Sequence, residues 1–204
     1  KDGFTMAQVG YLGSALAVTY GLSKFIMGNV SDRSNPRYFL ALGLFLSALV
    51  NLLVPGTLSF SGLFLLMLMN GWVQGMGWPP CGRIMTHWFS DSERGTKMSI
   101  WNTAHNVGAG LLPLIVAIGV WAFGSWSGLF YLPAICAIVF SILILIFGRD
   151  VPQSVGLPPI EVYRNDYPLA EVEHDLVDRE QEMTTKQIMF DYVLNNKNVW
   201  FMAI

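Results

Sequence analysis

Charged side chains are scarce in this sequence, and long stretches lack them altogether. Only 13% of the 204 residues are Asp, Glu, Lys or Arg, whereas an average soluble domain has roughly 25%. No formal charge occurs from Tyr38 to Gly82 or from Met98 to Gly148. Such gaps are typical of membrane-spanning segments, because a charge at the bilayer centre costs about 2.5–3.5 kcal/mol even on insertion scales. The composition predicts an all-α polytopic membrane protein.

The sequence is also poor in the residues that build disulfides, metal sites and catalytic centres. Its two cysteines, Cys81 and Cys136, fall in apolar segments without C-x-x-C spacing, which favours apolar packing. The three histidines form no ligand pair, so we expect no metal and no cofactor. No carboxylate lies in the apolar runs to act as a base, which argues against a membrane enzyme. We expect no nucleic-acid partner either.

Five apolar runs are long enough to cross the hydrocarbon core, which takes about 20 residues of helix. They are Met6–Gly28, Tyr38–Val54, Gly62–Met85, Met98–Phe123 and Leu129–Gly148. A sixth run begins near Val199. We therefore predict an N-terminal transmembrane bundle in residues 1–148, a cytoplasmic linker in 149–196 and the start of another transmembrane helix in 197–204.

The predicted linker is rich in proline at its start and acidic in its middle. Near its end, Ile188, Met189, Tyr192 and Val193 recur with helical spacing after Thr184 and Thr185, either of which could cap a helix. This pattern predicts a short amphipathic helix on the membrane surface. A disordered acidic linker throughout is the alternative.

Basic residues are confined to alternate connections. The loops at 29–37 and 86–97 contain Arg33, Arg37, Arg94 and Lys97, whereas those at 55–61 and 124–128 contain no charge. The positive-inside rule places the basic loops in the cytoplasm. The first span then runs inward from the outside, so we expect one further helix upstream.

Two ionisable residues within the predicted spans, His105 and Lys24, are candidates for function. His105 lies about 12 Å inward from Lys97 along a helix, and Asn102 and Asn106 share its face. These side chains could join helices by hydrogen bonds. They could also bind an anion, because an imidazole with a reference pKa near 6.5 readily gains charge at neutral pH.

Lys24 is the second such residue, close to the cytoplasmic end of its span, with Tyr20 one turn deeper on the same face. It either extends to the membrane interface or contacts an anion. In the third run, Asn70, Gln74 and Trp78 form a stripe that could line a cavity or join helices. Gly71 and Gly75, a G-x-x-x-G pair, predict close helix packing.

Several of these segments resemble one family. "GNVSDRSNPR" (28–37) resembles the loop between the second and third helices of the major facilitator superfamily, in which Gly28, Asp32 and Arg33 match and Arg37 lies near a terminal basic position. More specifically, the chain is similar to the organophosphate:phosphate antiporters of that superfamily. That likeness lies in "GWVQGMGWPPCGR", "SERGT", "SIWNTAHNVG" and "VPQSVGLPPIEVYRNDYP". It extends from the second helix to the start of the seventh.

The resemblance implies most of the N-terminal half of a transporter with two pseudo-symmetric halves, set in the bacterial cytoplasmic membrane. Such a protein exchanges an organic phosphate ester for inorganic phosphate by alternating access. Glycerol-3-phosphate is the favoured ester and hexose-6-phosphate the alternative. A sensor that detects phosphate esters and retains the fold is another alternative. The expected partners are the small-molecule substrates, the bilayer and the other half of the same transporter chain.

The resemblance also implies roles for particular residues. The expected substrate-binding residues are His105, Lys24, Tyr20, Asn102, Gln74 and Trp78. The expected gating residues are Asp32, Arg33, Arg37 and Arg94. Two arginines that hold the phosphate in the family, one on the first helix and one on the seventh, have no counterpart in this sequence.

Overall fold

The computed structural model describes residues 4–164 and 195, and every regular element in them is helical. The chain divides into two compact units, residues 1–160 and 161–204. The α-helices are α1 (Met6–Asp32), α2 (Pro36–Leu53), α3 (Phe60–Gln74), α4 (Trp78–Trp88), α5 (Asp91–Phe123), α6 (Gly128–Phe147) and α7 (Ile160–Arg164). The 3₁₀ turns are η1 (Val54–Gly56) and η2 (Pro152–Val155).

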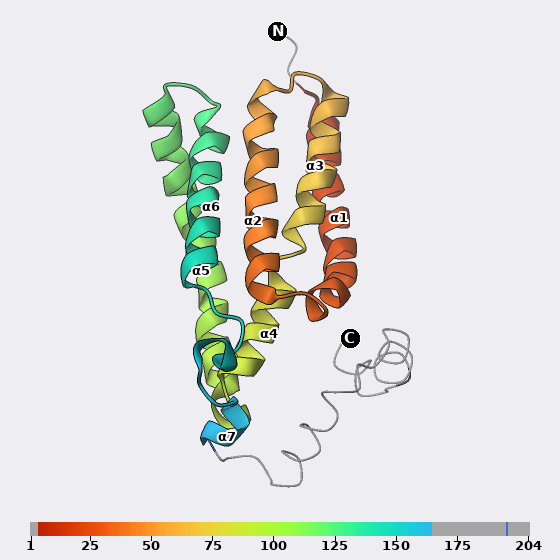
Figure 1. Ribbon diagram of the computed structural model, residues 1–204. Coiled ribbons are helices and arrows are strands. Elements are labelled where there is room, and N and C mark those ends of the chain that lie inside the picture. The colour runs from red at the N-terminus through yellow and green to blue at the C-terminus, as the bar shows by residue number, and fades with distance from the viewer. Residues whose placement is uncertain (1–3, 165–194, 196–204) are drawn as a thin grey trace. The chain divides into compact units, whose positions relative to one another are not determined.

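The long helices of the first unit run alternately up and down. Figure 1 shows the α1–α2 turn and the α4–α5 turn at one end, and η1 and the α5–α6 turn at the other. Helix α1 packs along α3, α2 packs along both α6 and α3, and α5 packs along α6. The connections that carry charge therefore lie together at one end of the bundle, and the uncharged connections lie at the other.

Local sequence signals set the helix ends. Thr5 and Gln8 form a capping box at the start of α1. The side chain of Asn35 accepts hydrogen bonds from the backbone of Arg37 and Tyr38 at the start of α2, where Pro36 fits because its missing N–H needs no partner. Helix α5 ends at Gly124, whose φ of 60° is a left-handed conformation that glycine adopts without strain.

The predicted run Gly62–Met85 is wrong as a single helix. It forms α3 and α4, separated by a break at residues 75–77. The physical reason is local. Gly75 and Gly77 flank the break, and glycine is a poor helix former. Pro79 lies in the first turn of α4, where proline is tolerated, whereas in the middle of a continuous helix it would disrupt the hydrogen bonding. By contrast, α5 continues through Pro113 without interruption.

The other predicted spans correspond to helices α1, α2, α5 and α6 with shifted ends. Within the described residues, three segments are long and apolar enough to cross a membrane unaided: Pro36–Gly56, Asp91–Phe123 and Gly128–Phe147. Helix α1 has the length but is more polar, and α3 has only 15 residues.

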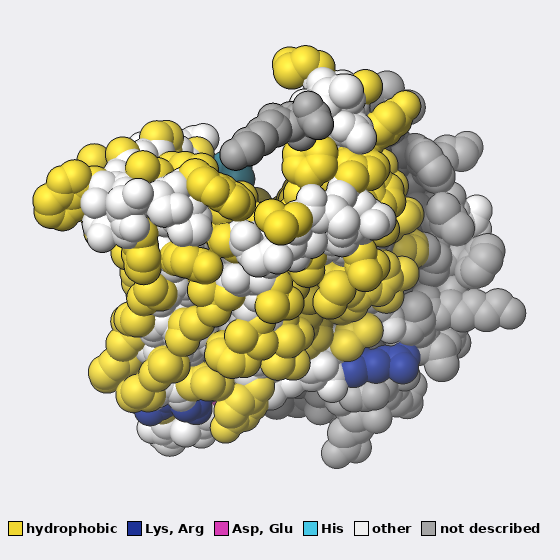
Figure 2. Space-filling model, turned by 90° about the horizontal axis from the view of Figure 1, so that it is seen from above, with side chains coloured by type: hydrophobic (Ala, Val, Ile, Leu, Met, Phe, Trp, Pro, Cys, Tyr) yellow, Lys and Arg dark blue, Asp and Glu magenta, His cyan; other side chains and the backbone are white. Residues whose placement is uncertain are grey.

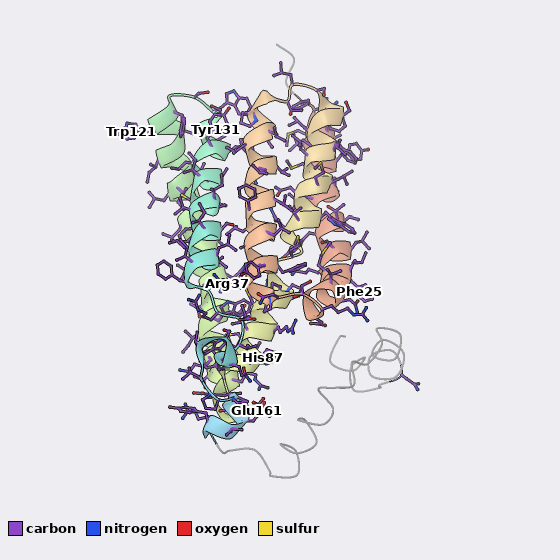
Figure 3. The ribbon with its side chains drawn as sticks, viewed as in Figure 1. Phe25, Arg37, His87, Trp121, Tyr131 and Glu161 are labelled. Atoms are coloured by element: carbon purple, nitrogen blue, oxygen red, sulfur yellow. The ribbon has the colours of Figure 1, made fainter. Side chains whose placement is uncertain are left out.

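Hydrophobic side chains fill the contacts between helices and also cover the outside. Val50, Val54 and Leu66 form a buried cluster between α2 and α3. On the outside, Phe25 and Trp121 are 65% and 84% exposed and point away from the bundle (Figure 3). Exposed hydrophobic side chains along the helices suit lipid rather than water. Figure 2 looks onto the end of the bundle that carries η1 and the α5–α6 turn, and hydrophobic atoms dominate this view as well.

Helices α5 and α6 approach each other most closely at two glycines. A Cβ added at Gly119 would lie 3.0 Å from the backbone carbon of Gly128, and one added at Gly128 would lie 2.9 Å from the amide nitrogen of Val120. Two backbones can come this close only where both residues lack a side chain. This glycine pair sets how closely α5 packs against α6.

Two predictions fall outside the described residues. They are the amphipathic helix at 184–193 and the transmembrane segment at 197–204. The boundaries predicted for the linker likewise remain predictions.

Candidate functional site

Lys24 lies between two aromatic rings from different helices. Its Nζ atom is 4.3 Å from the ring centre of Tyr20, one turn earlier on α1, and 5.4 Å from that of Trp78, the first residue of α4. Each distance is within the range of a cation–π contact, worth about 0.5–2 kcal/mol depending on solvent exposure. The lysine is half-buried, and in the described chain it forms no salt bridge. The structure thus brings three of the predicted substrate-binding residues together.

Trp101 joins this group and was not predicted. Its ring packs edge-on against that of Trp78, with 4.6 Å between the centroids and 79° between the planes. Trp101 is four residues before His105 on α5, so the two share a helix face. The four-residue spacing from His105 is the sequence feature that could have indicated Trp101 as a site residue. We name Lys24, Tyr20, Trp78 and Trp101 the aromatic–lysine cluster.

Gln74 is placed differently from Trp78, although both were predicted on one stripe. Its side-chain amide donates to Oδ1 of Asn70 at 3.2 Å, and the same oxygen accepts a hydrogen bond from Ser47 on α2 at 2.8 Å. Gln74 and Ser47 also line a pocket of about 300 Å³ between α2 and the end of α3. Asn70 therefore joins helices, which is one of the two alternatives predicted for this stripe. Gln74 borders a cavity, which is the other.

His105 and Asn102 are exposed on α5, as is Asn106. Within residues 4–164, their side chains form no hydrogen bond or ion pair with another helix. Among the described residues, the interpretation that these side chains join helices therefore finds no support. In the same part of the chain, no hydrogen bond or ring contact joins His105 to the aromatic–lysine cluster, and the link between them is the face of α5 that His105 shares with Trp101.

The predicted gating residues lie at the ends of three helices, α1, α2 and α5. Asp32 and Arg33 are exposed at the end of α1. The guanidinium of Arg37 lies 5.3 Å from the ring of Tyr38 on α2. Arg94 forms an ion pair with Asp91 in the first turn of α5 and donates from Nε to the carbonyl of Phe89 at 3.3 Å.

A different arginine connects the helices at this end. Nη1 of Arg83, on α4, lies 3.0 Å from the carbonyl oxygen of Ser31 and 2.7 Å from those of Asp32 and Ser34. The last carbonyls of a helix lack internal partners and carry partial negative charge, so a guanidinium placed there is favourable. Sequence reasoning missed this role, because it depends on which helix end α4 meets. We name this arrangement the Arg83 clamp.

The segment after α6 is attached to both the α1–α2 turn and α4. Asn35 donates from Nδ2 to Oδ2 of Asp150 at 2.7 Å, and Trp88 donates from Nε1 to the carbonyl of Arg149 at 3.2 Å. Partial burial raises the pKa of Asp150, but hydrogen bonds from its own backbone, Ser154, Val151 and Asn35 outweigh it. The pKa of this carboxyl therefore lies below its ordinary value.

The described residues offer no place for a metal ion, because they contain no group of three His, Cys, Asp or Glu side chains that could hold one. Chemically, the aromatic–lysine cluster provides a fixed positive charge beside ring faces and N–H donors. Such a site suits an anion carried on an organic group.

Comparison with known proteins gives consistent relatives. The chain is 56% identical over 207 residues to the glycerol-3-phosphate transporter of Bacillus subtilis (strain 168), covering 100% of this chain and 46% of that protein. It is 44% identical to a probable hexose phosphate transport protein of Chlamydia trachomatis, covering 98% of this chain and 45% of the relative. It is 37% identical to the membrane sensor protein UhpC of Escherichia coli (strain K12), covering 97% of this chain and 44% of that protein.

The chain thus spans less than half the length of these curated relatives. Residues 2–204 match the Major Facilitator Superfamily, which is nearly the whole sequence. Together with the helical fold and its apolar spans, this match establishes that the chain is part of a multi-pass membrane protein and belongs to the Major Facilitator Superfamily.

Proposed function

We propose that the intact protein containing this chain is a secondary transporter of the bacterial cytoplasmic membrane. It exchanges an organic phosphate ester, with glycerol-3-phosphate favoured, for inorganic phosphate by alternating access. The observation that carries the proposal is Lys24, held between Tyr20 and Trp78 on two helices. The names of the relatives, two of which refer to phosphate esters, support the substrate class.

The charge of the substrate explains why a lysine and a histidine are useful in a membrane. A phosphate monoester carries about −1.5 to −2 charge at pH 7 and three strong acceptor oxygens. It must exchange its water for cations and donors before it can reach the membrane interior. Lys24 supplies a cation, and His105 supplies an imidazole N–H donor.

The same charges explain exchange rather than one-way transport. An empty site holds positive charge that is partly removed from water, and this makes reorientation without a bound anion unfavourable. Either phosphate or its ester compensates that charge. Tyr20, Trp78, Gln74 and Asn102 would then bind the organic part and set its orientation, and no covalent chemistry is needed.

Gating falls to the charged end of the bundle in this proposal. Asp32, Arg33, Arg37 and Arg94 lie at or near the two turns at that end. Each can exchange its present contacts for contacts with the other half of the protein when the cytoplasmic side closes. Such exchange of charge-assisted contacts is a common basis for two-state movement.

Counterflow in liposomes containing the full-length protein tests the proposal. Vesicles loaded with inorganic phosphate should accumulate radiolabelled glycerol-3-phosphate faster than glucose-6-phosphate, and should leave uncharged glycerol outside. Replacement of His105 by Ala should reduce exchange at least tenfold, whereas Ser61→Ala in the first turn of α3, at the uncharged end of the bundle, should have no effect. Equal transport of glycerol and its phosphate would exclude an anion site.

A sensor is the second candidate, favoured by the likeness to the membrane sensor protein of Escherichia coli. It would bind a phosphate ester at the same cluster but would not accumulate it. Binding measured by calorimetry, together with the absence of counterflow, would identify a sensor.

A further inference from the structure

The break between α3 and α4 leaves one backbone carbonyl for another helix to satisfy. At the break, the amide of Met76 donates to Val73 at 3.1 Å and that of Gly77 to Gln74 at 3.2 Å, which are bonds over three residues rather than four. In a continuous α-helix the amide of Met76 would donate to Trp72 instead. The carbonyl of Trp72 does not receive this amide and is available to accept a hydrogen bond from another helix.

Ser23 on α1 supplies that hydrogen bond. Its side chain is fully buried, at 0% exposure, and its hydroxyl donates to the carbonyl oxygen of Trp72. The two backbones meet beside it, because a Cβ added at Gly75 would lie 2.9 Å from the amide nitrogen of Lys24. The hydroxyl and the glycine together place the break directly against the turn of α1 that carries Lys24.

The break also changes the direction in which Trp78 points. On an unbroken helix, residues four apart share a face, so Trp78 would lie above Gln74. Instead, Gln74 borders the pocket beside α2, while Trp78 reaches Lys24 on α1 and Trp101 on α5. The shape of the break therefore decides whether the aromatic–lysine cluster forms.

We propose that Ser23 is a positioning residue for the substrate site: by bonding the Trp72 carbonyl, it holds the α3–α4 break in the shape that places Trp78 against Lys24. It touches no substrate itself. This inference rests on the proposed function for its effect on transport, but its geometric part can be measured without any substrate.

The transport test compares two buried serines in the full-length protein. Ser141 is also buried, at 2% exposure, and donates to the carbonyl of Ala41 on another helix at 2.8 Å, but its bond joins α6 to α2. Ser23→Ala should raise the KM for glycerol-3-phosphate about fivefold to tenfold, the effect expected from losing one buried hydrogen bond, with little change in kcat. Ser141→Ala should lower the melting temperature to a similar extent and leave KM unchanged.

A double-mutant cycle then tests whether Ser23 acts through Trp78. On a Trp78→Leu background, which removes the ring, Ser23→Ala should add less than a twofold change in KM, because the contact that it positions is already lost. Equal KM changes for the two serine variants, or full additivity of Ser23→Ala with Trp78→Leu, would overturn the inference.

Fluorine NMR of 5-fluorotryptophan protein separates this inference from the proposed function. The resonance of Trp78, assigned by its loss in Trp78→Phe, should shift in substrate-free Ser23→Ala and not in Ser141→Ala. If Ser23→Ala shifts the resonance but the wild-type protein binds no phosphate ester, the positioning role is supported and the transporter is contradicted. An unmoved resonance in a protein that exchanges phosphate esters would contradict the positioning role alone.

Discussion

Asn35 and Asp150 are joined by a hydrogen bond of 2.7 Å, although they are 115 positions apart in the sequence. The bond attaches the chain that follows α6 to the turn between α1 and α2. Because Trp88 bonds the neighbouring carbonyl of Arg149, residues 149–150 hold both α2 and α4 at the charged end of the bundle.

Acid should weaken this attachment within a defined pH range. The pKa of Asp150 lies below its ordinary value, so its ionised form stabilises the fold above the unfolded pKa of about 3.9, and that stability is lost as the pH falls through the lower folded pKa. Asp150→Asn should lower the melting temperature of the full-length protein in detergent at pH 7, and the difference from wild type should begin to shrink as the pH falls below about 4 and vanish only below the folded pKa of Asp150. Asn35→Ala is the control, since it should lower the melting temperature at pH 7 and retain part of the acid dependence.

Removal of the charge on Lys24 should weaken binding of phosphate esters. Lys24→Gln abolishes both cation–π contacts, so we expect the KM for glycerol-3-phosphate in counterflow to rise about tenfold or more. Lys97→Gln is a matched control, because Lys97 also lies over an aromatic ring, 5.5 Å from the centre of Phe89, but at the start of α5. Equal effects of the two substitutions would show that Lys24 has no special role.

Loss of the Arg83 clamp should destabilise the protein more than loss of an ordinary helix-end arginine. Arg83→Gln removes a charged donor from three carbonyls at the end of α1, which should cost about 1.5–3 kcal/mol of stability. Arg149→Gln is the comparison, since Arg149 bonds only carbonyls of its own helix end, Ile146 and Gly148. Chemical denaturation in detergent would measure both, and equal losses would contradict the clamp.

A side chain at the α5–α6 contact should separate the two helices. Gly128→Val would force the two backbones apart, because even an added Cβ would lie 2.9 Å from the amide nitrogen of Val120, so we expect a cost of about 2 kcal/mol or more and reduced yield of folded protein. Gly108→Val on α5 has open space around its Cα and should have little effect on the melting temperature. An unchanged melting temperature for the Gly128 variant would show that the helices are not in close contact.

The sequence allowed most helices to be predicted, because missing charge and apolar length report directly on burial in a membrane. It also indicated Lys24, Tyr20 and Trp78, since a lysine one turn from a tyrosine can be recognised on one helix. It could not place Trp78 against Lys24. That contact depends on the break at Gly75–Gly77, which rotates α4 relative to α3, and a reading of Gly62–Met85 as one helix puts Trp78 on the face of Gln74.

Arg83 and Trp101 were missed for a related reason. Each acts through a partner on a distant segment, and nothing in the local pattern of "CGRIMTHWF" or "SIWNT" names that partner. His105 and Asn102 were identified by their unusual setting in an apolar helix, and their role in substrate binding stays a prediction.

The Arg83 clamp reaches main-chain oxygens and no side chain. Ser23, Ser141 and Trp88 do the same at their own contacts. Every residue type has the same backbone carbonyl. Mutations at the accepting positions therefore leave these hydrogen bonds intact as long as the backbone conformation is unchanged, whereas substitution of a donor side chain removes the bond.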